Sequence, residues 1–164
     1  MKKKVIILSI VIFAISYLLY IQLSPKSVYK LINEDTSFTI RKESISSKKI
    51  KEDLDIVLSE SIDHIHVNVI GKSEIMHSVL FEKNFQGSIV NWKYGENDDI
   101  EPLLIGRIEV QDFSHLIVEG IKANQIKFIS YKGQHYFYVL SSEISQPIHI
   151  KLLGENNKLL YESV

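Results

Sequence analysis

Two histidines stand two positions apart in the segment DHIHVNV, residues 63–69. Residues two apart on a β-strand point to the same face, so His64 and His66 can both reach one metal ion. Zinc takes three or four protein ligands, and His77, on the strand expected next, is the obvious third. The pattern raises the hypothesis of a membrane-tethered hydrolase or metal-dependent enzyme that uses His64 and His66 with a distant acid.

The pairing of these two strands decides whether His77 joins the other histidines. A two-residue loop at Gly71-Lys72 places His77 opposite His66. A three-residue loop through Ser73 instead places His77 opposite Val67. The second register gathers five apolar side chains on one face: Ile65, Val67, Val69, Ile75 and Val79. Burial of an apolar face fixes register, so we expect His77 on the face opposite the other two histidines and predict no metal site there.

Carboxylates also gather in the turn-rich segment GENDDIEP, residues 95–102: Glu96, Asp98, Asp99 and Glu101. Their charge attracts Ca²⁺, but they lack the D-x-[DN]-x-[DN]-G spacing that wraps a calcium ion. We expect a solvated loop. Asp53 and Asp55 lie at strand spacing close to Lys51 and are expected on an exposed charged face.

Other kinds of catalytic chemistry find little support in the sequence. The chain has no cysteine, which excludes disulfides, thiol nucleophiles and cysteine zinc sites. It has no G-x-S-x-G elbow and no glycine-rich phosphate loop. We therefore assign no catalytic residue, no cofactor-binding residue and no cofactor, and we expect that the protein is not an enzyme.

The strongest single pattern is an uncharged apolar run from Val5 to Leu23. Its 19 residues span about 28 Å as a helix, close to the thickness of a bilayer core. Lys2–Lys4 precede it, which predicts a single-pass anchor with the N-terminus in the cytoplasm and the remaining chain outside. The alternative is a signal peptide cleaved near Ala14-Ile15-Ser16.

The net charge and the spacing of apolar residues indicate what lies beyond the apolar run. Net charge is −1 with Lys2–Lys4 included, so the rest is mildly acidic and predicts no nucleic-acid surface. Ser24-Pro25 is typical of a helix start, and Val28, Leu31 and Ile32 recur at helical spacing, which predicts a short amphipathic helix within residues 24–35. That helix either packs on the following domain, which we favour, or lies on the membrane.

Residues 36–164 are expected to form a β-rich domain. Phe38 and Ile40 alternate with polar residues, and Ser44–Lys49 is expected to be a polar break. The run His135–Leu140 is apolar on both faces, as in a buried central strand, with a ligand-stacking surface as the alternative. The strands are predicted at Leu54–Leu58, Ile62–Ile70, Ile75–Phe81, Ser88–Tyr94, Leu103–Gln111, His115–Glu119, Gln125–Tyr131, Gln134–Leu140, Ile148–Leu153 and Lys158–Tyr161. Such short, regular strands predict an antiparallel β-sandwich or a barrel-like domain.

The layout resembles small membrane-anchored proteins of Bacillus-type Gram-positive bacteria, most of them of unknown function. The similar parts are the KKK-led anchor, Ser24-Pro25, the strand NWKYG, the segment GRIEVQDFSHLIVEGIKA and the closing YFYVL…PIHIKLLGENNKLLYES. The resemblance implies an extracytoplasmic β-domain and assigns no catalytic residue.

These observations lead to one expectation and two alternatives. We expect a membrane-anchored, extracytoplasmic binding or regulatory module, with residues 1–23 as anchor, 24–35 as helix or linker and 36–164 as domain. Its expected partners are the lipid bilayer, through Val5–Leu23, and another membrane or envelope protein. The alternatives are the enzyme using His64 and His66 and an accessory subunit of a larger membrane complex.

Overall fold

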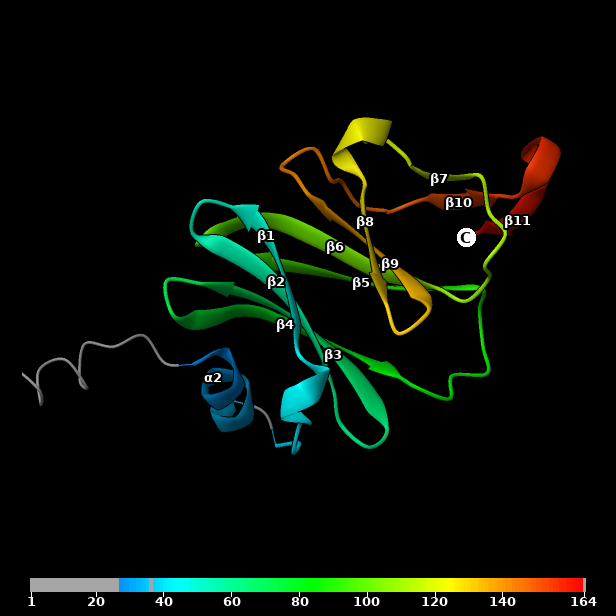
Figure 1. Ribbon diagram of the computed structural model, residues 1–164. Coiled ribbons are helices and arrows are strands. Elements are labelled where there is room, and N and C mark those ends of the chain that lie inside the picture. Colours follow the sequence, from blue (N-terminus) through cyan, green and yellow to red (C-terminus); the bar gives the residue numbers. More distant parts are fainter. Residues whose placement is uncertain (1–26, 36, 164) are drawn as a thin grey trace, which may run out of the picture.

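The computed structural model describes residues 27–35 and 37–163, which form three antiparallel sheets and one short α-helix (Figure 1). Sheet A has the order β1-β2-β3-β4, at Ser46–Lys51, Leu54–Glu60, His64–Gly71 and Glu74–Glu82. Sheet B has the order β5-β6-β9-β8, at Val90–Asn97, Ile100–Ile108, Gln134–Leu140 and Lys127–Tyr131. Sheet C has the order β11-β10-β7, at Leu159–Glu162, Ile150–Leu153 and His115–Val118. The predicted mainly β fold is confirmed.

The three sheets form successive layers because an apolar core lies on each face of sheet B. The first core joins sheets A and B, where Leu58 and Ile105 are among its members. The second core joins sheets B and C, where Leu104 and Ile150 are both fully buried. The expectation was a β-sandwich or a barrel-like domain, and the observed domain is built from three antiparallel sheets.

Strand β9 shows why the run His135–Leu140 is apolar on both faces. Tyr136 and Tyr138 belong to the core shared with sheet A. Phe137 and Val139 belong to the core shared with sheet C. Successive side chains of a strand point to opposite faces, so a strand with a core on each side needs apolar residues at every position. The predicted buried central strand is confirmed.

Helix α2, at Val28–Asp35, covers the outer face of sheet A (Figure 1). Ser27 caps it, since its Oγ accepts a hydrogen bond from the backbone N–H of Lys30 at 3.3 Å. Ile32 is fully buried against Val57 and Ile70 of sheet A. The helix thus packs on the domain, as favoured above, while the cap expected at Ser24-Pro25 lies outside the described residues.

The hairpin between β3 and β4 corrects the predicted register. Its loop has two residues, Lys72 and Ser73, both at positive φ (50° and 69°) as in the tight turns that match strand twist. A bulge then follows at Met76, so that Val69 pairs with His77 and not with Ile75. The three-residue loop and the pairing of His77 with Val67 were both wrong predictions.

The bulge allows β4 to follow a two-residue loop and still bury its apolar face. A two-residue loop alone shifts β4 by one position and would turn its apolar residues away from the core. One extra residue restores the phase, so Val79 and Phe81 still face sheet B. Ile75, on the loop side of the bulge, packs on the outer face beside Ile70 instead of joining the predicted apolar set.

Each predicted strand has an observed counterpart, and β9 has the predicted ends while the others are shifted or change length. Three further segments differ from expectation. The expected polar break Ser44–Lys49 is largely strand β1, an exposed lysine-rich edge strand. The expected acidic loop 95–102 is a tight hairpin, because β5 continues to Asn97 and β6 begins at Ile100. The segment with Phe38 and Ile40 forms no strand and lies across the outer face of sheet A.

The predicted anchor, Val5–Leu23, lies outside the described residues. Within residues 27–35 and 37–163, no helix has the length and apolar character needed to cross a bilayer.

Candidate functional site

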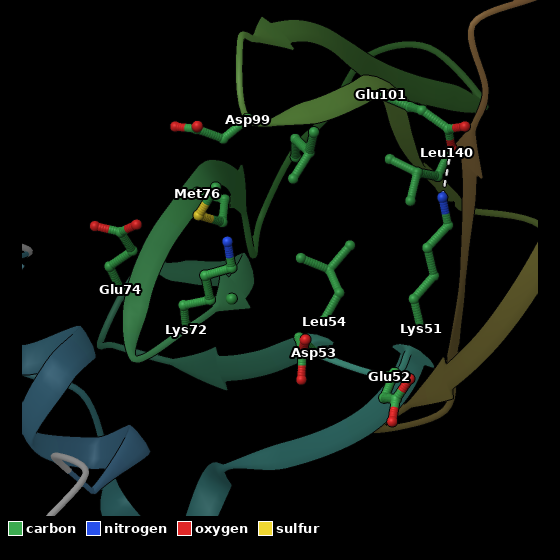
Figure 2. Close-up of a pocket in the computed structure, with 12 residues that line it drawn as sticks. Lys51, Glu52, Asp53, Leu54, Lys72, Glu74, Met76, Asp99, Glu101 and Leu140 are labelled. Atoms are coloured by element: carbon green, nitrogen blue, oxygen red, sulfur yellow. Dashed lines mark hydrogen bonds and ion pairs between the residues drawn. The ribbon is translucent and has the colours of Figure 1, made fainter.

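A cavity of about 450 Å³ opens between sheets A and B where three hairpins end (Figure 2). These hairpins join β1 to β2, β3 to β4, and β5 to β6, and the last residue of β9 completes the wall. We call this hollow the end cavity. It forms where the first core stops, so its floor is apolar and its rim consists of turn residues.

The floor consists of four apolar side chains: Leu54, Met76, Ile100 and Leu140. All four belong to the first core or pack against it, so the floor is held by the same contacts that stabilise the domain. In Figure 2 the side chain of Leu54 rises between the hairpin tips, toward the strand that carries Glu101. The floor is therefore a preformed apolar surface.

The rim is charged and mostly acidic. It carries five carboxylates, at Glu52, Asp53, Glu74, Asp99 and Glu101, and two ammonium groups, at Lys51 and Lys72. Figure 2 shows the carboxylates of Glu52 and Asp53 pointing away from the hollow. The rim includes neither a histidine nor a serine, so it offers charge and hydrogen bonding to a ligand without a nucleophile–base pair.

One ion pair crosses the mouth from sheet A to sheet B. Lys51 Nζ lies 2.7 Å from Glu101 Oε2, and both side chains are about half exposed. A smaller hollow of about 250 Å³, lined by Tyr138 and Lys127 among others, shares Lys51 and Leu140 with the end cavity. The Lys51–Glu101 pair thus lies where the two hollows adjoin. Because both side chains are about half exposed, the ion pair adds little energy to holding the mouth of the end cavity shut.

The four carboxylates considered above as calcium ligands have separate contacts in the structure and do not converge on one point. Glu96 accepts a hydrogen bond from Tyr94 Oη at 2.5 Å, and Glu101 pairs with Lys51. Asp98 and Asp99 form the turn between β5 and β6. Among the described residues there is no group of three or more His, Cys, Asp or Glu side chains arranged to hold a metal ion.

The structure places His64 and His66 on one face of β3 and His77 on the other. His64 and His66 face outward beneath the ring of Phe38, whose centroid lies 5.2 Å and 5.4 Å from theirs. His77 pairs with Val69, whose side chain faces the first core, and its ring lies against Gly95 of sheet B. The predicted separation of the three histidines is confirmed, although the pairing that achieves it differs.

His66 is the most unusual of the three. It is fully buried, and its Nε2 lies 3.0 Å from the hydroxyl of Ser61, itself buried. Burial lowers the pKa of His66, and the charges of His64 and Lys83 lower it further. Sequence reasoning missed this serine–histidine contact. No acid orients the ring, because the buried Nδ1 has no hydrogen-bond partner, and burial denies a substrate access to Ser61.

A second feature that the sequence did not reveal lies at the opposite end of the A–B sandwich, where β2 ends at Glu60. The Glu60 carboxylate is only 8% exposed and meets three cations. Lys83 Nζ lies at 3.1 Å, Arg41 at 3.6 Å, and Lys132 donates a short hydrogen bond. The hydrogen bond from Lys132 is the main cause that lowers the pKa of Glu60, and Lys83 adds to it while burial opposes both.

Arg107 extends this charged end into the interior. It is fully buried, donates a hydrogen bond from Nη1 to the carbonyl oxygen of Glu82 at 2.6 Å and forms an ion pair with Glu109. Its guanidinium lies over the ring of Phe81, 5.8 Å from the centroid. Burial raises the pKa of Tyr136 to about 12 despite the nearby Arg107. These contacts are internal, so this end closes the sandwich while the other end stays open.

The geometry therefore separates a closed, ion-paired end from an open cavity. Comparison with protein families, with curated proteins and with solved structures found no match for this chain.

Proposed function

We propose that the protein is a membrane-anchored binding module, without catalytic activity, whose extracytoplasmic domain takes a small amphipathic ligand in the end cavity. The observation that carries the proposal is the cavity itself, with an apolar floor and a charged rim between two rigid sheets. Its volume of about 450 Å³ falls within the range of ligand pockets. The domain belongs outside the cell if Val5–Leu23 is the anchor, because Lys2–Lys4 favour the cytoplasmic side.

The rim favours a ligand with a positive charge. Of the five carboxylates, those of Glu52 and Asp53 point away from the hollow, and that of Glu101 is paired with Lys51. The carboxylates of Glu74 and Asp99 then outnumber the one remaining ammonium group, that of Lys72. A short alkyl chain fits against Leu54 and Ile100, while an ammonium head group lies near Asp99. A protein partner in the envelope, as expected from the sequence, would present the same alkyl chain and ammonium group in the form of a lysine side chain.

Three probes with the same six-carbon chain test this proposal: hexylamine, hexanol and hexanoate. Each is titrated into the full-length protein in lipid nanodiscs, and backbone amide shifts are followed by NMR. We expect shifts in the turns that line the end cavity, with hexylamine binding about three- to tenfold more tightly than hexanoate because of the acidic rim. Equal binding, or preference for hexanoate, would refute the charge argument.

A pair of matched variants locates the binding. Met76→Trp fills the cavity floor and should abolish the shifts. Leu159→Trp, at an exposed position of β11 in sheet C, adds the same side chain elsewhere and should leave the binding unchanged. If no probe shifts the cavity amides, or if Met76→Trp still binds, the end cavity is not the ligand site.

The anchor is tested separately by topology. A reporter fused after Val164 should be active on the outer side of the membrane. Activity in the cytoplasm would contradict the proposed orientation without affecting the cavity.

A further inference from the structure

The chain before sheet A lies across the outer face of that sheet as a strap, which we define as residues 27–35 and 37–44. It consists of α2, a stretch without regular structure at 37–41 and the 3₁₀-helix Lys42–Ser44. Its C-terminal end is firmly held. The backbone N–H of Arg41 donates to the carbonyl oxygen of Glu60 at 2.9 Å, the N–H of Glu60 donates to Ser44 Oγ at 2.9 Å, and Tyr131 Oη donates to the Ser44 carbonyl at 2.6 Å.

The rest of the strap, residues 27–35 and 37–40, is held in a different way. Among the described residues, no backbone–backbone hydrogen bond joins it to sheet A. It is held by packing, chiefly of the buried Ile32 and Ile40 on Val57 and Ile70. The strap is therefore hydrogen-bonded to the sheets at its C-terminal end, and its other described residues pack on sheet A through apolar side chains.

The surface beneath the strap is unusually polar for a buried face. Ser59, His66 and Asn68 are all fully buried there, and we call them the polar strip. Ser59 pairs with His66, and Asn68 pairs with Val57, so the three form one continuous patch on β2 and β3. Phe38 packs on His66, and Asn68 pairs with Val57, which packs against the strap.

Four polar atoms of this strip have no hydrogen-bond partner. They are Ser59 Oγ, His66 Nδ1 and both the oxygen and the nitrogen of the Asn68 amide. Buried polar groups are rarely left unpaired, because each loses its bonds to water without replacement. The closed strap thus leaves these four atoms without a partner in the protein, and opening brings them into contact with bulk water.

We propose that the strap is a hinged cover that opens about Arg41–Ser44 while the three sheets stay folded, and that opening exposes the polar strip. Helix α2 has eight residues, carries Glu34 and Asp35 at its C-terminal end and has no basic residue in its last turn. So short a helix, with acidic residues at the negative end of its dipole, is marginal alone. It therefore unfolds when it leaves the sheet, and opening is a local unfolding event.

Native-state hydrogen exchange on the full-length protein tests the proposal. The amides of α2 from Leu31 onward are compared with those of β10, in the second core. We expect α2 to exchange at least about a hundredfold faster than β10, since it opens without global unfolding. If α2 exchanges only as fast as β10, the strap has no opening of its own and the proposal fails.

Two serines on the same face of sheet A provide a matched pair of variants. Ser59 is buried without a partner, whereas Ser78 is exposed. Ser59→Ala removes an unpaired hydroxyl, keeps the shape and should slow exchange of α2 about tenfold. Ser78→Ala should leave it unchanged. If Ser59→Ala slows the exchange of the β10 amides but not that of the α2 amides, the helix frays without uncovering the polar strip, and the hinged cover is excluded.

Discussion

Glu60 shows at the scale of one residue how a carboxylate can hold several segments together. Its cationic partners come from three parts of the chain: the strap through Arg41, the end of β4 through Lys83 and the β8–β9 turn through Lys132. Because the carboxylate is nearly buried, it is screened less than a surface ion pair.

Replacing this carboxylate with an amide should destabilise the fold. Glu60→Gln removes the charge but keeps the shape, leaving three cations facing each other. We expect a loss of about 1–3 kcal/mol in the free energy of unfolding, measured by urea denaturation at about pH 7. Glu52→Gln, on the exposed β1–β2 turn, is the control and should change little. Equal effects of the two substitutions would contradict the role given to Glu60.

The same pair of proteins gives a test of pH dependence. The pKa of Glu60 is lowered by folding, so its contribution is fully present above the ordinary value of 4.5 and is lost as pH falls through the folded pKa. The stability difference between the wild type and Glu60→Gln should therefore shrink from about pH 7 to about pH 3. A difference that stays constant over this range would show that the charge is not responsible.

At the scale of elements, the contact between β4 and β5 depends on one glycine. The ring of His77 lies where a Cβ of Gly95 would be, so the imidazole packs directly on the glycine backbone and must move if a larger residue replaces the glycine. The bulge in β4 is what turns His77 toward this position.

Adding that Cβ should displace the imidazole of His77 from its place between the two strands. We expect Gly95→Ala to destabilise the protein by about 1–3 kcal/mol and His77→Ala to relieve most of this cost by making room. A double-mutant cycle with urea denaturation measures the coupling. Additive effects of the two substitutions would contradict the proposed contact.

Particular elements also show how far the sequence determines the fold. Strand β9 was predictable to its ends because its continuous apolar run marks a central strand that is buried on both faces. Strand β1 was missed, since SSKKIK has no apolar period and forms a strand only by pairing with β2. The loop and bulge after β3 were missed because turn geometry and burial compete there, and only the three-dimensional packing decides between them.

The functional features divide in the same way. The strand faces on which the histidines lie were predictable. Side chains alternate between the two faces of a strand, so a register error of two residues leaves each histidine on the same face. The end cavity was not, since Leu54, Met76 and Leu140 come from distant parts of the chain and no local pattern links them. The buried Glu60 was equally hidden, because a glutamate at the end of a strand gives no sequence signal of its three partners.

At the scale of the whole molecule, sheet B belongs to both cores and couples the outer sheets. Leu104 and Ile105 are neighbours in β6, yet Leu104 packs toward sheet C and Ile105 toward sheet A. Substituting either with alanine should cost about 2–5 kcal/mol. We expect one cooperative transition in both variants, with coincident tryptophan fluorescence and circular dichroism curves. Two separated transitions in either variant would show that the layers unfold independently.

The one-ended attachment of the strap also has a consequence for reach. The stretch from residue 27 to residue 40 is 14 residues long, and fully extended it spans at most about 50 Å. The eight residues of α2, Val28–Asp35, span only about 12 Å as a helix. If residues 5–23 hold the protein in a membrane, opening the strap therefore changes how far the end cavity can stand from the lipid surface. A local unfolding event becomes a change in the distance over which the domain can search for its partner.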